Sequence, residues 1–282
     1  MRDKETFDTV ITSHRGWFDV NIREIIRYRD LILMFVKRNF IANYKQTILG
    51  PAWAIVQPLL TTVVFTIVFG RIAHLPTDGV PPFLFYMCGN VAWGYFSGCL
   101  TQTATTFTAN AGVMGKVYFP RLVMPISSVF SQLIQFGIQF LFLLFFLAYY
   151  SFLNNTPYIT WGILYLPLLL LNMALLGLGC GVIISSLTTK YRDLTMLIGF
   201  GIHLWMYATP VVYTIDMIPE KWRALYLCNP MAITIELFRN MFFGTNTLTA
   251  ANIAFCWGIT LLITLGGILL FNRVEKTFMD TV

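Results

Sequence analysis

Residues 28–58 read YRDLILMFVKRNFIANYKQTILGPAWAIVQP, a charged segment that runs directly into an uncharged one. At helical spacing, Ile32, Val36 and Phe40 form an apolar stripe on the charged segment. Basic residues gather on the opposite side, where Met34 and Ile41 intrude; they are Arg27, Lys37, Arg38 and Lys45. We predict an amphipathic helix in the plane of the membrane surface, with its basic side toward phosphates or a cytoplasmic partner. The alternative is an ordinary amphipathic helix of a soluble protein.

The pattern breaks at Gly50 and Pro51, and an uncharged run from Ala52 to Gly70 begins there. Proline is tolerated in the first turn of a helix, because the N–H that it lacks would have no partner inside the helix. The segment therefore predicts an elbow, in which a helix on the membrane surface turns into a helix that crosses the membrane.

The composition is that of a membrane protein. The chain has 282 residues, of which 57% are hydrophobic and 11% are charged, whereas about 25% of the residues of a soluble domain are charged. A membrane-spanning helix needs about 20 apolar residues. We therefore predict an all-α polytopic membrane protein. Its six transmembrane helices are expected near residues 52–70, 83–107, 122–150, 161–188, 194–213 and 250–272.

The basic residues predict the orientation. With six spans and an N-terminus in the cytoplasm, 15 of the 19 Lys and Arg residues lie inside and 4 lie outside, as the positive-inside rule requires. A seventh crossing at 230–243 would weaken this division. Both termini are then cytoplasmic, and the chain divides into an N-terminal segment with the interface helix (1–48), a transmembrane domain (49–272) and a cytoplasmic tail (273–282).

The segment between the fifth and sixth spans, residues 215–245, is apolar but carries several charges. Pro219 and Pro230 each stand where a helix could begin. We predict two short re-entrant helices that enter the membrane and return on the outer side. Glu236 and Arg239 are spaced to pair at i,i+3 on the second of them.

Small residues mark the fourth predicted span. Gly177, Gly179 and Gly181 include a pair of glycines four residues apart, a spacing that favours close packing between membrane helices. We expect a packing role for these glycines and assign them no role in transport.

The chain lacks the residues that would supply its own energy or chemistry. The predicted spans contain His203 as their one titratable acid or base, whereas ion-driven carriers use such groups as relays. The sequence GVMGKV at 112–117 lacks the earlier glycine and the following Ser or Thr of a phosphate-binding loop. No spacing of acids, cysteines or histidines indicates a catalytic or metal site. A pump built from this chain would take its energy from another subunit.

Two short polar breaks on the predicted inner side could receive that energy. One is residues 112–120, GVMGKVYFP, followed by Arg121, and the other is residues 190–194, KYRDL. Both are compact charged turns between long helices, of a size to fit a cleft on a cytoplasmic partner. Charge alone does not separate this interpretation from simple connecting loops.

Aromatic residues make up 16% of the chain. Rings at the ends of spans usually form a belt at the membrane interface. They could instead line a channel in which a sugar polymer slides over ring faces; the candidates in the second and fifth spans are Tyr86, Trp93, Tyr95, Trp205 and Tyr207.

Several motifs resemble those of one known family. In order, they are LGPAWAIVQP at 49–58, KVYFPR at 116–121, YRDL at 191–194, TPVVY at 209–213, Ile218-Pro219, Trp222, Asn229-Pro230 and Arg239. Together they are similar to the permeases of type-2 ABC exporters, specifically those that export lipid-linked polysaccharides such as O-antigen (Wzm-like). The resemblance covers nearly the whole chain after about residue 25.

The resemblance implies roles for these motifs. Two coupling helices toward the ATPase would contain Gly115, Lys116, Tyr118 and Arg121 in the first, and Tyr191, Arg192 and Asp193 in the second. The re-entrant helices would form an exit gate with Pro219, Trp222, Asn229, Pro230, Glu236 and Arg239. The polymer would cross between two copies of the permease in the bacterial inner membrane. Two ATPase subunits would carry ATP and Mg, with no cofactor and no nucleic acid bound by this chain.

Other interpretations stay open at this point. The cargo could be teichoic acid, capsule or a small drug. A polytopic enzyme acting on lipid-linked sugars would have Glu236, Arg239 and Asp216 as its candidate groups. A secondary carrier would need titratable groups inside the membrane that the spans do not offer.

Overall fold

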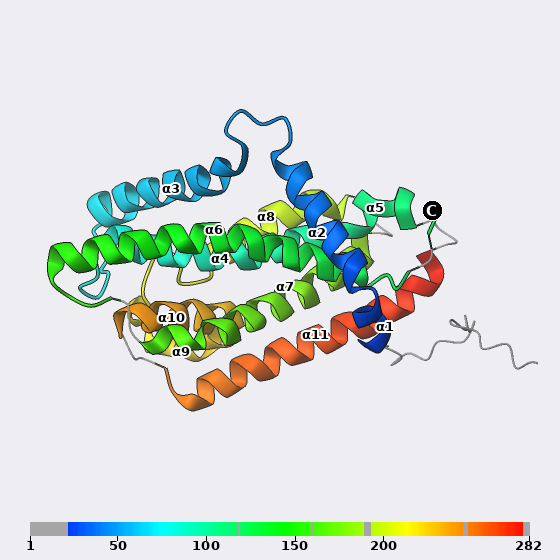
Figure 1. Ribbon diagram of the computed structural model, residues 1–282. Coiled ribbons are helices and arrows are strands. Elements are labelled where there is room, and N and C mark those ends of the chain that lie inside the picture. The colour runs from blue at the N-terminus through cyan, green and yellow to red at the C-terminus, as the bar shows by residue number, and fades with distance from the viewer. Residues whose placement is uncertain are drawn as a thin grey trace, which may run out of the picture.

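The computed structural model describes residues 22–114, 116–117, 119–158, 161–188, 193–244 and 248–278, and these residues form helices joined by turns. The long helices lie side by side in a bundle, with α9 and α10 at one end and α1, α5 and the end of α11 at the other (Figure 1). In chain order, the helices are α1 (Ile22–Arg27), α2 (Arg29–Tyr44), η1 (Gly50–Ala52), α3 (Trp53–Phe65), η2 (Thr66–Ile72), α4 (Pro82–Ala104), α5 (Thr106–Met114), α6 (Val123–Asn154), η3 (Trp161–Tyr165), α7 (Leu166–Thr188), α8 (Leu194–Tyr207), η4 (Ile215–Met217), α9 (Glu220–Leu227), α10 (Pro230–Phe243) and α11 (Ala250–Phe278).

Four helical segments among the described residues are long and apolar enough to cross a membrane, and the chain is an integral membrane protein. They are Gly50–Ile72, Val123–Asn154, Trp161–Thr188 and Ala250–Phe271. All four coincide with predicted spans. Of the other two predicted spans, α4 is long enough but less apolar, and α8 is a helix of 14 residues.

The predicted break between two helices is present, whereas the position of the first helix at a membrane surface stays a prediction. Helix α2 ends at Tyr44, and the next helical turn, η1, begins at Gly50 with Pro51 in its first turn. Gly50 has a φ of +54°, in the left-handed region that glycine adopts at little cost. The chain then continues through α3, and its last turns form a π-helix, η2.

Helix α2 buries one face against the rest of the chain. Ile32, Phe35 and Val36 are buried in a small apolar cluster with the start of α6 and with Phe271 of α11. Two of the three predicted stripe residues, Ile32 and Val36, therefore face the protein, while Phe40 is half-buried. This face packs on protein in the structure, rather than being free to lie on a membrane.

Helix α4 is the centre of the main core, because α3, α6, α7, α8 and α10 all pack on it. Glycines on α7 permit its closest contacts. A Cβ added at Gly177 would lie 2.7 Å from Cβ of Cys99, and one at Gly181 would lie 2.9 Å from the carbonyl oxygen of Leu100. Small residues four apart let two backbones approach closely, so the predicted packing role of this pair is confirmed.

The segment after α8 forms two short helices, as predicted. Pro219 is the N-cap residue of α9, and Pro230 is the first residue of α10. Helix α9 is exposed, whereas most of α10 is buried against α4, α7 and α11. Their helical boundaries agree with the sequence, and their depth in a membrane stays a prediction.

Candidate functional site

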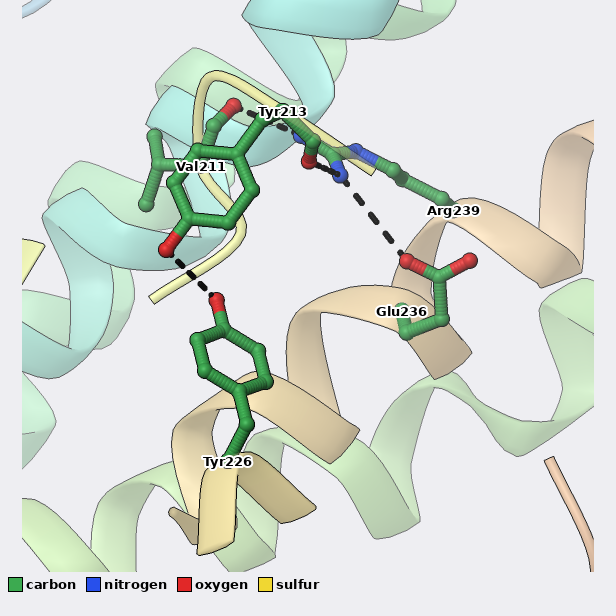
Figure 2. A network of polar contacts seen from close by, with 5 residues as sticks. All are labelled: Val211, Tyr213, Tyr226, Glu236 and Arg239. Atoms are coloured by element: carbon green, nitrogen blue, oxygen red, sulfur yellow. Dashed lines mark hydrogen bonds and ion pairs between the residues drawn. The ribbon is translucent and has the colours of Figure 1, made fainter. Parts of the chain in front are cut away.

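The site at the α9–α10 end of the bundle is built around the buried guanidinium of Arg239. Only 1% of the Arg239 surface is exposed. Its Nη2 donates a hydrogen bond to the carbonyl oxygen of Val211 at 2.6 Å, and Nη1 donates to that of Tyr213 at 3.3 Å (Figure 2). Arg239 therefore holds the turn that links α8 to η4.

Two further groups stabilise this charge. A carboxylate oxygen of Glu236 lies 3.9 Å from Nη1 of Arg239, one helical turn away (Figure 2). This confirms the predicted i,i+3 pair. On the other side, the guanidinium carbon lies 3.7 Å from the ring centre of Phe85 on α4. A cation over an aromatic face is attracted by the ring quadrupole, so α4 also takes part in the site.

Gly89 allows the turn between α8 and η4 to lie directly against α4. A Cβ at this position would lie 2.6 Å from the carbonyl oxygen of Val211 and 2.9 Å from Nη2 of Arg239. Both distances are shorter than real Cβ contacts, and the first is to backbone. Neither Gly89 nor Phe85 is predicted from the sequence, since one glycine or one phenylalanine in an apolar helix gives no signal.

Asn229 joins the same turn to the start of α10. Its Oδ1 accepts hydrogen bonds from the backbone N–H of Met231 at 3.1 Å and from Nε1 of Trp205 at 3.2 Å. Its Nδ2 donates to the carbonyl oxygen of Ala208 at 3.2 Å and to Oγ1 of Thr209 at 3.0 Å. Asn229 is thus both the N-cap of α10 and a link to the end of α8.

More charges surround this end of the bundle. Arg223 of α9 forms an ion pair with Asp216 at 2.8 Å, on the exposed side. Partial desolvation raises the pKa of the exposed Asp78 carboxyl in the loop before α4; the charge of Asp216 adds to this rise, and Arg239 opposes it. The loop at Asp78 and the turn of η4 therefore belong to one electrostatic environment.

A cavity of about 570 Å³ opens beside these residues, between the end of α8, α9 and the start of α10. It brings together one predicted channel ring, Trp205, and three predicted gate residues, Trp222, Asn229 and Pro230. Tyr226 completes the aromatic part of the wall, and its hydroxyl donates a hydrogen bond to that of Tyr213 at 2.8 Å (Figure 2).

The other candidate site is at the opposite end of the bundle, where the predicted coupling loops lie. Lys116 is exposed in the turn after α5, Arg121 is half-buried before α6, and Asp193 is exposed at the N-cap position of α8. Gly115, Tyr118, Tyr191 and Arg192 lie outside the described residues. The four basic residues predicted for the interface helix, Arg27, Lys37, Arg38 and Lys45, are all exposed.

Comparison with known proteins shows the family of the chain. The family model for ABC-2 type transporters matches residues 30–243. The chain belongs to the ABC-2 type transporter family. The matched range begins in α2 and ends at Phe243, the last residue of α10, so both candidate sites fall within the part that defines the family.

Individual relatives of this ABC-2 chain are export proteins by name. The O-antigen export system permease protein RfbA of Klebsiella pneumoniae is 29% identical over 251 residues, which cover 89% of this chain and 94% of that protein. RfbA of Myxococcus xanthus is 29% identical over 79% of this chain and 84% of its own length. The capsule polysaccharide export inner-membrane protein CtrC of Neisseria meningitidis is 20% identical over 90% of this chain and 95% of its own.

The structure places the five predicted channel rings in two different environments. Tyr86, Trp93 and Tyr95 are 0%, 5% and 3% exposed inside the core of this ABC-2 chain. Burial within one copy leaves these three rings no surface that a passing polymer could touch in this structure. Trp205 is half-buried in the cavity wall, and Tyr207 is 54% exposed. Trp205 and Tyr207 therefore remain the candidates for a channel lining.

Proposed function

We propose that this chain is the permease subunit of an exporter that moves lipid-linked polysaccharide, O-antigen or a similar polymer, across the bacterial inner membrane. The observation that carries the proposal is the similarity to proteins named as O-antigen export permeases, which extends over 89% of this chain and 94% of one relative. Capsule polysaccharide is the second candidate cargo, because a relative of that name covers 90% of the chain at lower identity.

In this proposal the chain crosses the membrane six times, with both termini in the cytoplasm. The crossings beyond the four apolar segments are α4 and α8. Helix α4 has 23 residues without a charge, and 15 of them are buried by other helices, so it can span without a strongly apolar surface. Helices α9 and α10 are the re-entrant pair on the outer side. The excess of Lys and Arg on the inner segments supports this orientation.

We further propose that two copies of the permease work with two copies of a separate ATPase, which binds ATP and Mg. Helix α8 offers a surface on which two copies could pair, because one of its faces leaves five large apolar side chains exposed: Met196, Leu197, Phe200, Leu204 and Tyr207. An apolar face of this kind is covered by lipid or by another copy. The polymer would pass between the two copies.

The two ends of the bundle receive separate tasks in this scheme. Lys116, Arg121 and Asp193, with Gly115, Tyr118, Tyr191 and Arg192, would contact the ATPase, and α2 would pack beside it. At the outer end, Arg239 and Glu236 would hold the turn after α8 in place. Trp222, Asn229 and Pro230 would then form the exit beside Trp205 and Tyr207. This outer assembly combines ring faces for sugars with a scaffold that is fixed by buried charge.

Reconstitution tests the proposal. The chain is placed in proteoliposomes with its partner ATPase and with a lipid-linked polymer accessible from the ATPase side. ATP should move the polymer to the other leaflet only when both proteins are present. The chain alone should hydrolyse no ATP. Polymer movement that persists without the ATPase would contradict the proposal, and so would a complete complex that hydrolyses ATP and moves no polysaccharide.

A further inference from the structure

Arg38 of α2 contacts the helix that leads into the first predicted coupling loop. Its Nη2 donates a hydrogen bond to Oδ1 of Asn110 at 2.7 Å, across 72 residues of sequence. Asn110 lies at a kink in α5, where its φ of −118° and ψ of 15° depart from helical values. Its Nδ2 donates to the carbonyl oxygen of Thr106 at 2.9 Å. The Asn110 amide therefore joins the kinked helix to α2.

The other end of the same loop reaches α2 through aromatic packing. Phe119, which lies just before α6, is 6% exposed and packs on Phe35 of α2 with ring centres 5.9 Å apart. Phe35 is itself buried, and the guanidinium of Arg38 lies over its ring at 4.8 Å. Arg38 thus touches Asn110 directly and lies against the ring that holds Phe119.

We propose that Arg38 is a positioning residue that binds α2 and both ends of the loop between Asn110 and Phe119 into one mechanical unit. The inference rests on the proposed function, in which this loop contacts the ATPase. A displacement of the loop then carries α2 with it, instead of bending the chain at the α5 kink. The energy of the ATPase enters the permease through one body made of two segments that are distant in sequence.

The geometry requires an arginine at this position. Nε and Nη2 of Arg38 also donate to Oδ1 of Asn39 at 3.3 Å and 3.1 Å, while the guanidinium plane covers Phe35. The planar fork of arginine serves several acceptors at once, whereas the ammonium of lysine is a compact point charge. Lys37 is exposed on the same turn of α2. Lys37→Ala is therefore the matched control, because it also removes one positive charge.

A distance measurement tests the unit directly. Spin labels are attached to cysteines introduced at the exposed positions Asn43 of α2 and Val117 of the loop, in the full-length permease assembled with its ATPase in nanodiscs. The exposed native cysteine is removed by Cys228→Ser. Arg38→Ala should broaden the distance distribution, whereas Lys37→Ala should not. Asn110→Ala should broaden it as Arg38→Ala does, because it removes the acceptor of the same hydrogen bond. An unchanged distribution in Arg38→Ala would overturn the proposal.

A transport measurement tests the consequence. Arg38→Ala should lower the amount of polymer moved per ATP by roughly twofold to fivefold, a modest loss because the lost contact is exposed. The ATP hydrolysis rate is measured in the same samples, so that the loss is expressed per ATP. The double variant Arg38→Ala/Asn110→Ala should be no worse than the more affected single variant, because the two side chains act through each other.

The proposal is wrong if the losses of the two single variants add up in the double variant. It is also wrong if Arg38→Ala moves as much polymer per ATP as the wild type. The two proposals fail in different ways. If the unmodified complex moves no polymer, the proposed function is wrong, and the spin-label comparison between Arg38→Ala and Lys37→Ala still decides whether α2 and the loop move together.

Discussion

Helices α3 and α4 are neighbours, and α4 is the more buried of the two although it is the less apolar. In α4, 15 of 23 residues are buried, yet this helix is not apolar enough to count among the candidate spans. The segment Gly50–Ile72 has the same length and is apolar enough to be a candidate span, although only 17% of its most apolar stretch of 18 residues is buried. In Figure 1, α3 runs along one edge of the bundle, while α4 runs through its interior.

The surroundings of each helix explain the difference. A side chain that faces lipid must be apolar, since nothing there can satisfy a polar group. A helix surrounded by protein can carry small and polar residues, provided that its neighbours complement them. Gly89 and Asn90 of α4 have such neighbours: the turn after α8 fits against Gly89, and Asn90 donates a hydrogen bond to the carbonyl oxygen of Pro58 on α3. The pair shows that the less apolar of two neighbouring helices can be the more buried one.

The largest effect is expected from filling the space at Gly89. Gly89→Leu should prevent the permease from accumulating in the membrane, because the new side chain would meet the carbonyl of Val211 and the guanidinium of Arg239. Gly199→Leu on α8 is the matched control, since nothing lies within 4 Å of a Cβ at that glycine. Membrane abundance of the two variants by quantitative immunoblot checks the contrast, and equal abundance would show that α4 tolerates bulk at its closest contact.

The next effect concerns the buried charge pair. Arg239→Met should lower the free energy of unfolding by about 3–5 kcal/mol, because it removes the positive charge beside the buried carboxylate of Glu236. Arg223→Met removes the exposed partner of Asp216 and should cost at most about 1 kcal/mol. Thermal unfolding of the purified permease measures both. Arg239→Met/Glu236→Gln should recover part of the loss, and a double variant as unstable as Arg239→Met would argue against an electrostatic cause.

A smaller effect is expected where α4 touches α3. Asn90→Ala removes the hydrogen bonds from Nδ2 of Asn90 to the carbonyl oxygen of Pro58 at 3.1 Å and to Oγ1 of Thr62 at 3.4 Å. Side-chain hydrogen bonds between membrane helices contribute about 0.6 kcal/mol on average and about 1.7 at most. We therefore expect a stability loss within that range, with normal membrane insertion. A loss above roughly 3 kcal/mol, well beyond such bonds, would place Asn90 among the core residues that define the fold.

The smallest effect is expected on the exposed side of α3. Leu60 is 57% exposed, so Leu60→Ala should change the stability of the folded protein by no more than about 0.5 kcal/mol. Leu84→Ala on α4 is the counterpart, because Leu84 is fully buried and a cavity in a core costs about 2–5 kcal/mol. Comparable losses from the two substitutions would mean that α3 is covered by a second copy rather than by lipid.

The sequence predicted the parts of this fold that local chemistry decides. Gly50 and Pro51 indicated the break between α2 and α3, Pro219 and Pro230 indicated the starts of α9 and α10, and their positions are confirmed. The spacing of Glu236 and Arg239 was sufficient to predict their pair. In each case the relevant groups lie within a few residues of one another, so no knowledge of the tertiary fold is needed.

Other features depend on residues that are far apart in the chain. The contact of Gly89 with the turn at Val211 joins distant parts of the sequence, and no local sequence pattern predicts it. The same is true of the rings in α4, because aromatic residues are spread around this helix and the sequence does not show which neighbours cover them. Tyr86 and Trp93 looked like equal candidates to Tyr207 for that reason, although they are buried and Tyr207 is exposed.

The glycines of α7 constrain how this helix can change its length. Gly177 and Gly181 face α4, whereas Gly179 faces α11, where a Cβ would lie 2.8 Å from Cα of Thr264. Each residue advances a helix by about 100°, so a single inserted residue between Gly177 and Gly179 would turn one glycine away from its neighbour and bring a larger side chain into its place. Substitutions on the exposed face of α7 leave both contacts intact. Insertions and deletions inside it do not, and α7 therefore fixes the spacing of the two helices on either side of it.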